Sequence, residues 1–180
     1  MRVEVEGSIP TAPCIIVSNH LHNIDVPLAG RYAVRFGERV HWLAKAELFD
    51  IPLIGAILRA MQTIEIDREH PDRDSMQTMV HYARVDKVWI FPEGHRSPNG
   101  HLQPGKEGVA LLARLAHVPI VPIGIAGTEH GLLPLFLRRH SLQITIGEPF
   151  IIPSRLTRAE ILELVMSRIE MLLPQAYRRV

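Results

Sequence analysis

His20 and Asp25 stand five positions apart, directly after the apolar run 14–17. If the two side chains meet, the carboxylate accepts a hydrogen bond from one ring nitrogen, fixes the tautomer and leaves the other nitrogen free to take a proton. The pair therefore predicts a general base with an orienting acid. The sequence shows no obvious serine or cysteine partner for a nucleophilic triad, so direct attack by a substrate hydroxyl is the simpler chemistry.

Two other interpretations of these residues stay open. His20 and Asp25 can simply cap a helix, because a histidine and an aspartate at this spacing also occur by chance. His20, His22 and Asp25 can also be metal ligands, and the protein would then be a metal-dependent hydrolase. No further histidine or cysteine lies nearby at metal-ligand spacing, so we expect no bound metal.

A second polar segment, residues 91–97, follows another apolar run and reads FPEGHRS. The guanidinium of Arg96 fits a phosphate through paired, charge-assisted hydrogen bonds, and Gly94 lets the backbone approach a ligand closely. Arg68 adds a further cation, and residues 104–108 begin a helix whose N-terminus favours anions. A base beside an anion site is suited to acyl transfer onto a phosphorylated alcohol.

The elements that must position these groups alternate between apolar, strand-like runs and helical patterns. This alternation predicts an α/β fold with a mostly parallel mixed sheet flanked by helices. Residues five apart on a helix point about 140° away from each other, so the chain must turn between His20 and Asp25 before a helix begins. The N-terminal residues 1–6 also alternate like a half-buried strand, and residues 157–160 form a capping box before the last helix. Other strands are expected at 14–18, 40–44, 63–66, 87–91, 120–125 and 143–146, and other helices near 26–36, 46–61, 73–85 and 106–117.

Length and composition agree with one globular domain over residues 1–180. Hydrophobic residues make up 47% of the chain and the net charge is only +1, so a nucleic-acid-binding surface is not expected. The single cysteine, Cys14, excludes an internal disulfide, and its apolar run predicts a buried structural thiol. No apolar run reaches the roughly 20 residues that cross a bilayer, and no signal peptide is evident. We therefore expect a cytoplasmic protein.

Four ordered blocks resemble the PlsC-like 1-acylglycerol-3-phosphate acyltransferases, and the likeness extends over residues 10–147. The match also includes the lysine-bearing segment AKAEL between the first two blocks. The blocks are NHx4D at 19–25, IEIDR at 64–68, FPEGHRS at 91–97 and VPIVP at 118–122, and the lysine-bearing segment is at 44–48.

The resemblance implies the glycerol-3-phosphate acyltransferase-like αβ fold and a role for each block. His20 would be the general base and Asp25 would orient it. The acceptor would be 1-acylglycerol-3-phosphate or another lysolipid, and the donor acyl-CoA or acyl-carrier protein, with no cofactor. Backbone N–H groups near residues 93–95 would stabilise the oxyanion. The acceptor would be bound by Lys45, Arg68, Glu93, Gly94, His95 and Arg96.

The sequence departs from the family pattern in two places. His95 stands where the pattern usually has threonine, which adds a bulkier, titratable group beside the expected phosphate site. The sequence also begins almost at the first block, without the hydrophobic N-terminal helices of many relatives. We expect a peripheral protein on the cytoplasmic face of the membrane, with residues 131–139 or 49–58 as the lipid contact. Core packing is the favoured role for residues 49–58.

Overall fold

A seven-stranded sheet forms the centre of the protein in the computed structural model, which describes residues 2–27, 30, 39–66, 73–129 and 141–179. The strand order is β1-β7-β6-β2-β5-β3-β4, and neighbours run parallel except for the antiparallel pair β6–β7. The mostly parallel mixed sheet predicted from the sequence is confirmed. The strands are β1 (Arg2–Glu6), β2 (Cys14–Ser18), β3 (Val40–Lys45), β4 (Ile64–Ile66), β5 (Lys87–Ile90), β6 (Ile120–Ala126) and β7 (Ser141–Ile146).

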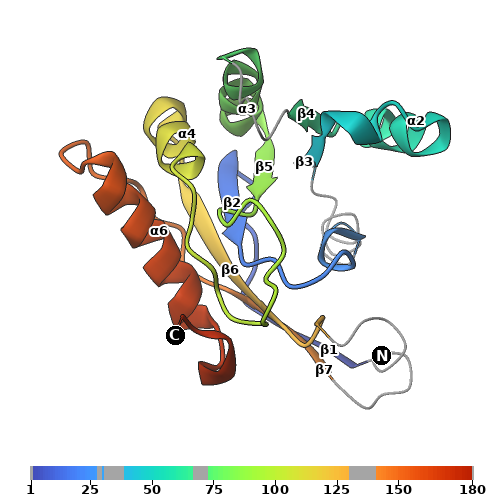
Figure 1. Cartoon of the computed structure of the whole chain (residues 1–180). Helices are drawn as coiled ribbons and strands as arrows, with labels where there is room; N and C mark the ends of the chain where they lie inside the picture. Colours follow the sequence, from blue (N-terminus) through green and yellow to red (C-terminus); the bar gives the residue numbers. More distant parts are fainter. Residues whose placement is uncertain (1, 28–29, 31–38, 67–72, 130–140, 180) are drawn as a thin grey trace.

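Three helices lie on one side of the sheet (Figure 1): α3 (Arg73–Val85), α4 (Gly108–Ala116) and α6 (Arg158–Leu172). Their apolar faces pack with alternate residues of β2, β5 and β6, such as Ile15 and Val88. The intervening residues of the same strands, such as Ile16 and Trp89, face a second apolar cluster. The central strands are almost entirely apolar because both of their faces are buried, and the polar residues Ser18 and Lys87 stand at strand ends.

Most expected elements form within a residue or two of their predicted bounds. The α3 range agrees with its prediction, the capping box of Thr157 and Glu160 begins α6, and the Cys14 thiol is buried. The helix expected at 46–61 instead divides into the 3-10 turn η1 (Ala46–Leu48) and α2 (Pro52–Ala60). Pro52 explains the break, because it disfavours helical geometry at the preceding residue. Most of the helix expected at 26–36 lies outside the described residues.

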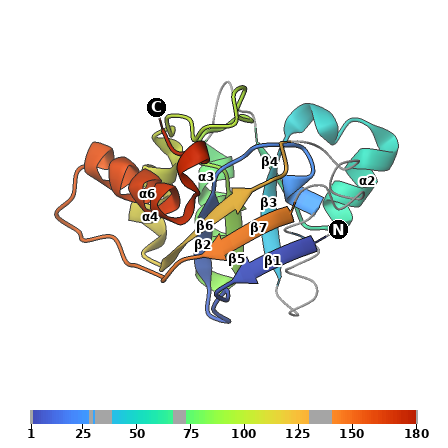
Figure 2. The same cartoon turned by 90° about the horizontal axis from the view of Figure 1, so that it is seen from below.

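The interpretation of residues 49–58 as core is wrong for α2, although Phe49 itself is buried. Figures 1 and 2 show α2 standing out from the sheet beside β3 and β4. Leu53 is 74% exposed and Ile57 is 51% exposed, and Gly55 is the one buried residue of the helix. The only charged residue of α2, Arg59, turns back and donates a hydrogen bond to Phe49 O at 3.1 Å. The outward face of α2 is therefore apolar. Within the described part of the chain, no helix is both long and apolar enough to span a bilayer.

Candidate active site

The polar segments singled out in the sequence meet at one edge of the sheet. Strands β2, β5 and β3 are parallel neighbours, so their carboxyl ends lie side by side. His20 follows β2, residues 91–97 follow β5, and Lys45 is the last residue of β3. The carboxyl edge of a parallel sheet is where α/β proteins commonly build their sites.

His20 and Asp25 are in direct contact. His20 Nδ1 lies 2.8 Å from Asp25 Oδ2, and the same oxygen accepts hydrogen bonds from the backbone N–H groups of Leu21 at 2.7 Å and His22 at 2.8 Å. The expected turn is present, because Asp25 N donates to His22 O at 3.0 Å. Asp25 is buried, so its carboxylate accepts from His20 Nδ1 and holds the imidazole in the tautomer that leaves Nε2 able to take a proton.

The ring of His20 also stacks on Phe91 of the second segment, with centroids 4.0 Å apart and planes inclined by 17°. One face of the imidazole is thus covered by β5's connecting segment. With the ring held at its edge by Asp25 and on its face by Phe91, His20 has little freedom to rotate.

Glu93 lies behind His20 and has no exposed surface. Its Oε1 accepts from His20 N at 2.7 Å, and its Oε2 accepts from Gln103 N at 2.8 Å. Burial raises the pKa of Glu93 to about 7, although the two backbone donors act in the opposite direction. The sequence predicted that Glu93 binds substrate. In the structure its carboxylate faces the protein interior, so its geometry favours holding the His20 loop instead of touching substrate.

Asn19 is a further buried residue of this loop whose task the sequence did not reveal. Its Nδ2 donates to Ile125 O and its Oδ1 accepts from Ile125 N, both at 2.8 Å. This double hydrogen bond ties the end of β2 to β6. The side chain satisfies a backbone donor and acceptor, as a buried amide must.

The remaining predicted residues differ in their placement. Gly94 turns the chain with φ +73°. His95 and Arg96 are exposed just beyond it, and His95 Nδ1 donates to Arg96 O at 3.1 Å. Lys45 is exposed at the end of β3. Arg68 lies outside the described residues.

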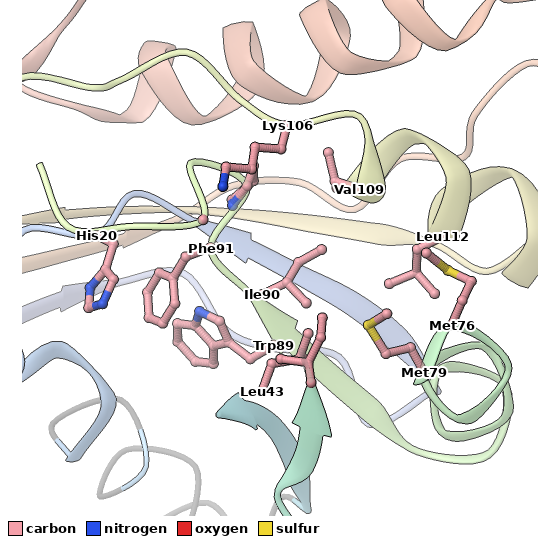
Figure 3. Close-up of a pocket in the computed structure, with 14 residues that line it drawn as sticks. His20, Leu43, Met76, Met79, Trp89, Ile90, Phe91, Lys106, Val109 and Leu112 are labelled. Carbon is pink, nitrogen blue, oxygen red and sulfur yellow. The ribbon is translucent and has the colours of Figure 1, made fainter. Parts of the chain in front are cut away.

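An apolar cavity of about 180 Å³ opens beside His20. Figure 3 shows His20, Phe91 and Lys106 toward one end, and Met76, Met79 and Leu112 toward the other. The cavity therefore has a polar mouth and an apolar interior, which suits a hydrocarbon chain with a reactive polar end. Its lining comprises His20, Leu43, Ile66, Met76, Met79, Trp89, Ile90, Phe91, Pro92, Gly94, Lys106, Gly108, Val109 and Leu112.

The metal-ligand interpretation of His20, His22 and Asp25 finds no cluster to support it. Among the residues that the structure describes, no group of three or more histidine, cysteine, aspartate or glutamate side chains is placed to hold a metal ion. The Nδ1 atom of His22 instead accepts a hydrogen bond from Ile24 N at 3.3 Å.

Known proteins resemble this chain in sequence and in fold. Human 1-acyl-sn-glycerol-3-phosphate acyltransferase alpha is 38% identical over 131 residues, which cover 68% of this chain and 45% of the human protein. The 1-acyl-sn-glycerol-3-phosphate acyltransferase of Bacillus subtilis (strain 168) is 30% identical over 136 residues, which cover 75% of this chain and 65% of the relative. The chain thus spans less than two thirds of either protein's length.

The fold is similar to the crystal structure of PlsC, the 1-acyl-sn-glycerophosphate acyltransferase from Thermotoga maritima. The TM-score is 0.70 at 28% sequence identity, with 95% of this chain and 72% of that chain covered. The model of the family described as Acyltransferase matches residues 2–126. The chain therefore belongs to the PlsC-like acyltransferase family.

Proposed function

We propose that this protein transfers a fatty acyl group from a thioester to the free hydroxyl of a lysophospholipid, with 1-acylglycerol-3-phosphate as the leading acceptor. The observation that carries the proposal is the bonded His20–Asp25 pair at the mouth of an apolar cavity. The names of the relatives agree with it, since the proteins from human, B. subtilis and T. maritima are all described as acting on this acceptor.

In the proposed reaction, His20 Nε2 takes the proton of the acceptor hydroxyl as its oxygen attacks the thioester carbonyl carbon. The carbonyl π electrons move onto the oxygen. When the tetrahedral intermediate collapses, the carbon–sulfur bond breaks. His20 returns the proton to the sulfur, which leaves as a thiol. Asp25 stabilises the imidazolium that exists between the two proton transfers. Acyl-CoA and acyl-carrier protein both carry the acyl group as a thioester. A thioester is already an activated acyl group, so the step needs no cofactor.

The acceptor phosphate would bind to the exposed cations at the same sheet edge. Arg96 presents its guanidinium just beyond the turn at Gly94, and Lys45 ends the neighbouring strand β3. Arg68 keeps its predicted role in phosphate binding. His95 donates a hydrogen bond to Arg96 O and so shapes the turn that carries this arginine. A histidine here in place of the family's usual threonine can therefore alter which acceptor is bound.

We further propose that the protein works at the cytoplasmic surface of a membrane and touches it through α2. The connection between β3 and β4 carries this helix, and both strands contribute residues to the cavity wall. The apolar face of α2 therefore stands near the site where a membrane lipid must enter. The other segment proposed for lipid contact, residues 131–139, lies outside the described residues.

The test is a thiol-release assay with palmitoyl-CoA and 1-acylglycerol-3-phosphate, with glycerol-3-phosphate and other lysolipids as competing acceptors. His20→Ala should lower turnover by roughly 10²–10⁴-fold, the usual contribution of a general base. His81→Ala is the matched control, because His81 is exposed on α3 and does not line the cavity. Equal turnover in His20→Ala and wild type would refute the mechanism.

A further inference from the structure

Lys106 is a cation at the cavity that the family blocks do not include. It lies in the segment before α4 and lines the same cavity wall as His20 and Gly94. Its backbone N–H donates to Pro92 O at 2.8 Å, which anchors the residue on the turn after β5. A residue of the segment between β5 and α4 is thereby brought to the cavity beside His20, which follows β2.

The side chain of Lys106 lies directly across Gly94. A Cβ atom added to Gly94 would stand 2.8 Å from Lys106 Cε, 2.9 Å from Cδ and 3.1 Å from Nζ. Glycine at this position therefore does more than permit φ +73°, because it leaves the space that the lysine occupies. Figure 3 shows the tip of Lys106 directed toward the His20 and Phe91 end of the cavity, away from Leu112.

The ammonium of Lys106 has no acidic partner within the described ranges of the chain, where the salt bridges involve other residues. An unpaired cation that lines an apolar cavity attracts negative charge on a ligand bound there. Arg96, His95 and Lys45 differ in this respect, because none of them lines the cavity.

Negative charge occurs at two places in the proposed reaction: on the thioester carbonyl oxygen as it becomes an oxyanion, and on the phosphate of the acceptor. The acyl chain must lie in the apolar cavity, and its carbonyl carbon must be within reach of the hydroxyl that His20 deprotonates. With the acyl chain placed in this way, the carbonyl oxygen would lie beside Lys106. The phosphate is on the part of the acceptor outside the cavity and would lie beside Arg96 and Lys45.

We infer that Lys106 is a catalytic residue that donates a hydrogen bond to the thioester carbonyl oxygen and stabilises the oxyanion formed on it. The inference rests on the proposed acyl transfer. Lys106 keeps its proton throughout: the π electrons move onto the oxygen as the new carbon–oxygen bond forms, and they return as the thiolate departs. The N–H of Gly94, a backbone donor expected for this task, is already bonded to Phe91 O at 3.0 Å.

The experiment measures kcat and the KM of each substrate in the full chain with palmitoyl-CoA and 1-acylglycerol-3-phosphate. Lys106→Met should lower kcat on the order of 100-fold, as expected for the loss of one oxyanion donor, with the acceptor KM unchanged. Lys106→Arg should recover part of kcat, because a guanidinium also donates. Lys106 is exposed, so melting curves should match the wild type, and Lys106→Gln gives a second, polar variant.

The control is Arg155→Met, which removes one exposed cation from the segment before α6 and should leave both constants unchanged. A raised acceptor KM with wild-type kcat in Lys106→Met would assign Lys106 to the phosphate and overturn the inference. An unchanged kcat and KM would overturn it as well. The proposed function would survive both results, whereas absence of turnover in the wild type would refute the function and this inference together.

Discussion

At the scale of single residues, three buried polar side chains hold His20, the proposed general base, in place. Asp25 bonds to the ring of His20, and Glu93 accepts from the backbone N–H of His20. Asn19, the residue before His20, bonds through its side chain to Ile125 of β6. Each bond is short, and the partners come from the segments after β2 and β5 and from β6. The position of His20 is consequently set by three neighbouring strands, which is the preorganisation that a proton transfer requires.

Glu93 makes the stability of the fold depend on pH. Burial raises the pKa of Glu93 from 4.5 to about 7. Between these two pH values, the folded protein keeps a proton on Glu93 that the unfolded chain has released. The stabilisation is complete below pH 4.5 and is lost as the pH rises through 7. The loss amounts to about 3 kcal/mol of unfolding free energy. Denaturant unfolding at pH 5 and pH 8 measures most of this loss.

Glu93→Gln provides the comparison for this prediction. Glutamine has nearly the same shape but does not titrate, so its unfolding free energy should change less between the two pH values. It also loses one acceptor, because its amide nitrogen cannot accept from the N–H of either His20 or Gln103. A wild-type pH dependence equal to that of Glu93→Gln would show that Glu93 does not titrate in this range.

At the scale of elements, the sheet and the helices packed on it could be predicted because their patterns reflect burial. Residues 88–90 of strand β5 are all apolar, and α3 has a regular apolar stripe. The contact between His20 and Asp25 could also be predicted, since it is local in the sequence. Helix α2 has the composition of a core helix yet is exposed, because nothing in its sequence tells which surface its apolar face meets. The inward turn of Glu93 and the approach of Lys106 to Gly94 depend on long-range packing.

Helix α2 should bind lipid surfaces through its exposed face. Replacing Leu53 and Ile57 with serine removes two large apolar side chains from that face, each of which contributes about 1.5–3 kcal/mol when fully buried. Partial insertion in a lipid surface predicts a loss of affinity for phosphatidylglycerol vesicles of roughly 10–100-fold, at 1.4 kcal/mol per factor of ten. Vesicle co-sedimentation measures the loss.

The matched control replaces Val85 and Leu115 with serine. These residues are also exposed and apolar, but Val85 is on α3 and Leu115 is on α4. Vesicle affinity that falls equally in both double variants, or in neither, would contradict a specific role for α2. A change of oligomeric state confined to the α2 variant would mean that a second copy covers this face.

At the scale of the whole molecule, the C-terminal part of the chain supports the site from outside the region matched by the family model. Strand β7 and helix α6 follow residue 126. Helix α6 packs so closely on the segment before α4 that a Cβ on Gly105 would stand 2.7 Å from Met166 Sδ and 2.8 Å from Leu162 Cδ1. Gly105 precedes Lys106, so α6 sets the path by which that lysine reaches the cavity.

Residues near the C-terminus also hold the segment between β5 and α4, through its residue Leu102. Tyr177 O accepts from Leu102 N at 2.8 Å, and the Tyr177 hydroxyl donates to Glu129 Oε1 at 2.6 Å. Burial and then this bond raise the pKa of Tyr177 to about 12, so the hydroxyl keeps its proton at neutral pH. The residue therefore connects the chain end both to the segment that leads to Lys106 and to the loop after β6.

Tyr177→Phe should consequently lower the unfolding free energy by about 1.5–3 kcal/mol, the net contribution of a hydrogen bond to a charged acceptor. Thiol release at temperatures well below unfolding should stay at the wild-type rate, since the backbone bond to Leu102 remains. Tyr82→Phe is the control, because within the described residues the Tyr82 hydroxyl has no hydrogen-bond partner. Equal denaturation midpoints for the two variants would show that the Tyr177–Glu129 bond does not stabilise the fold. A selective loss of turnover in Tyr177→Phe would instead mean that the chain end controls the position of Lys106.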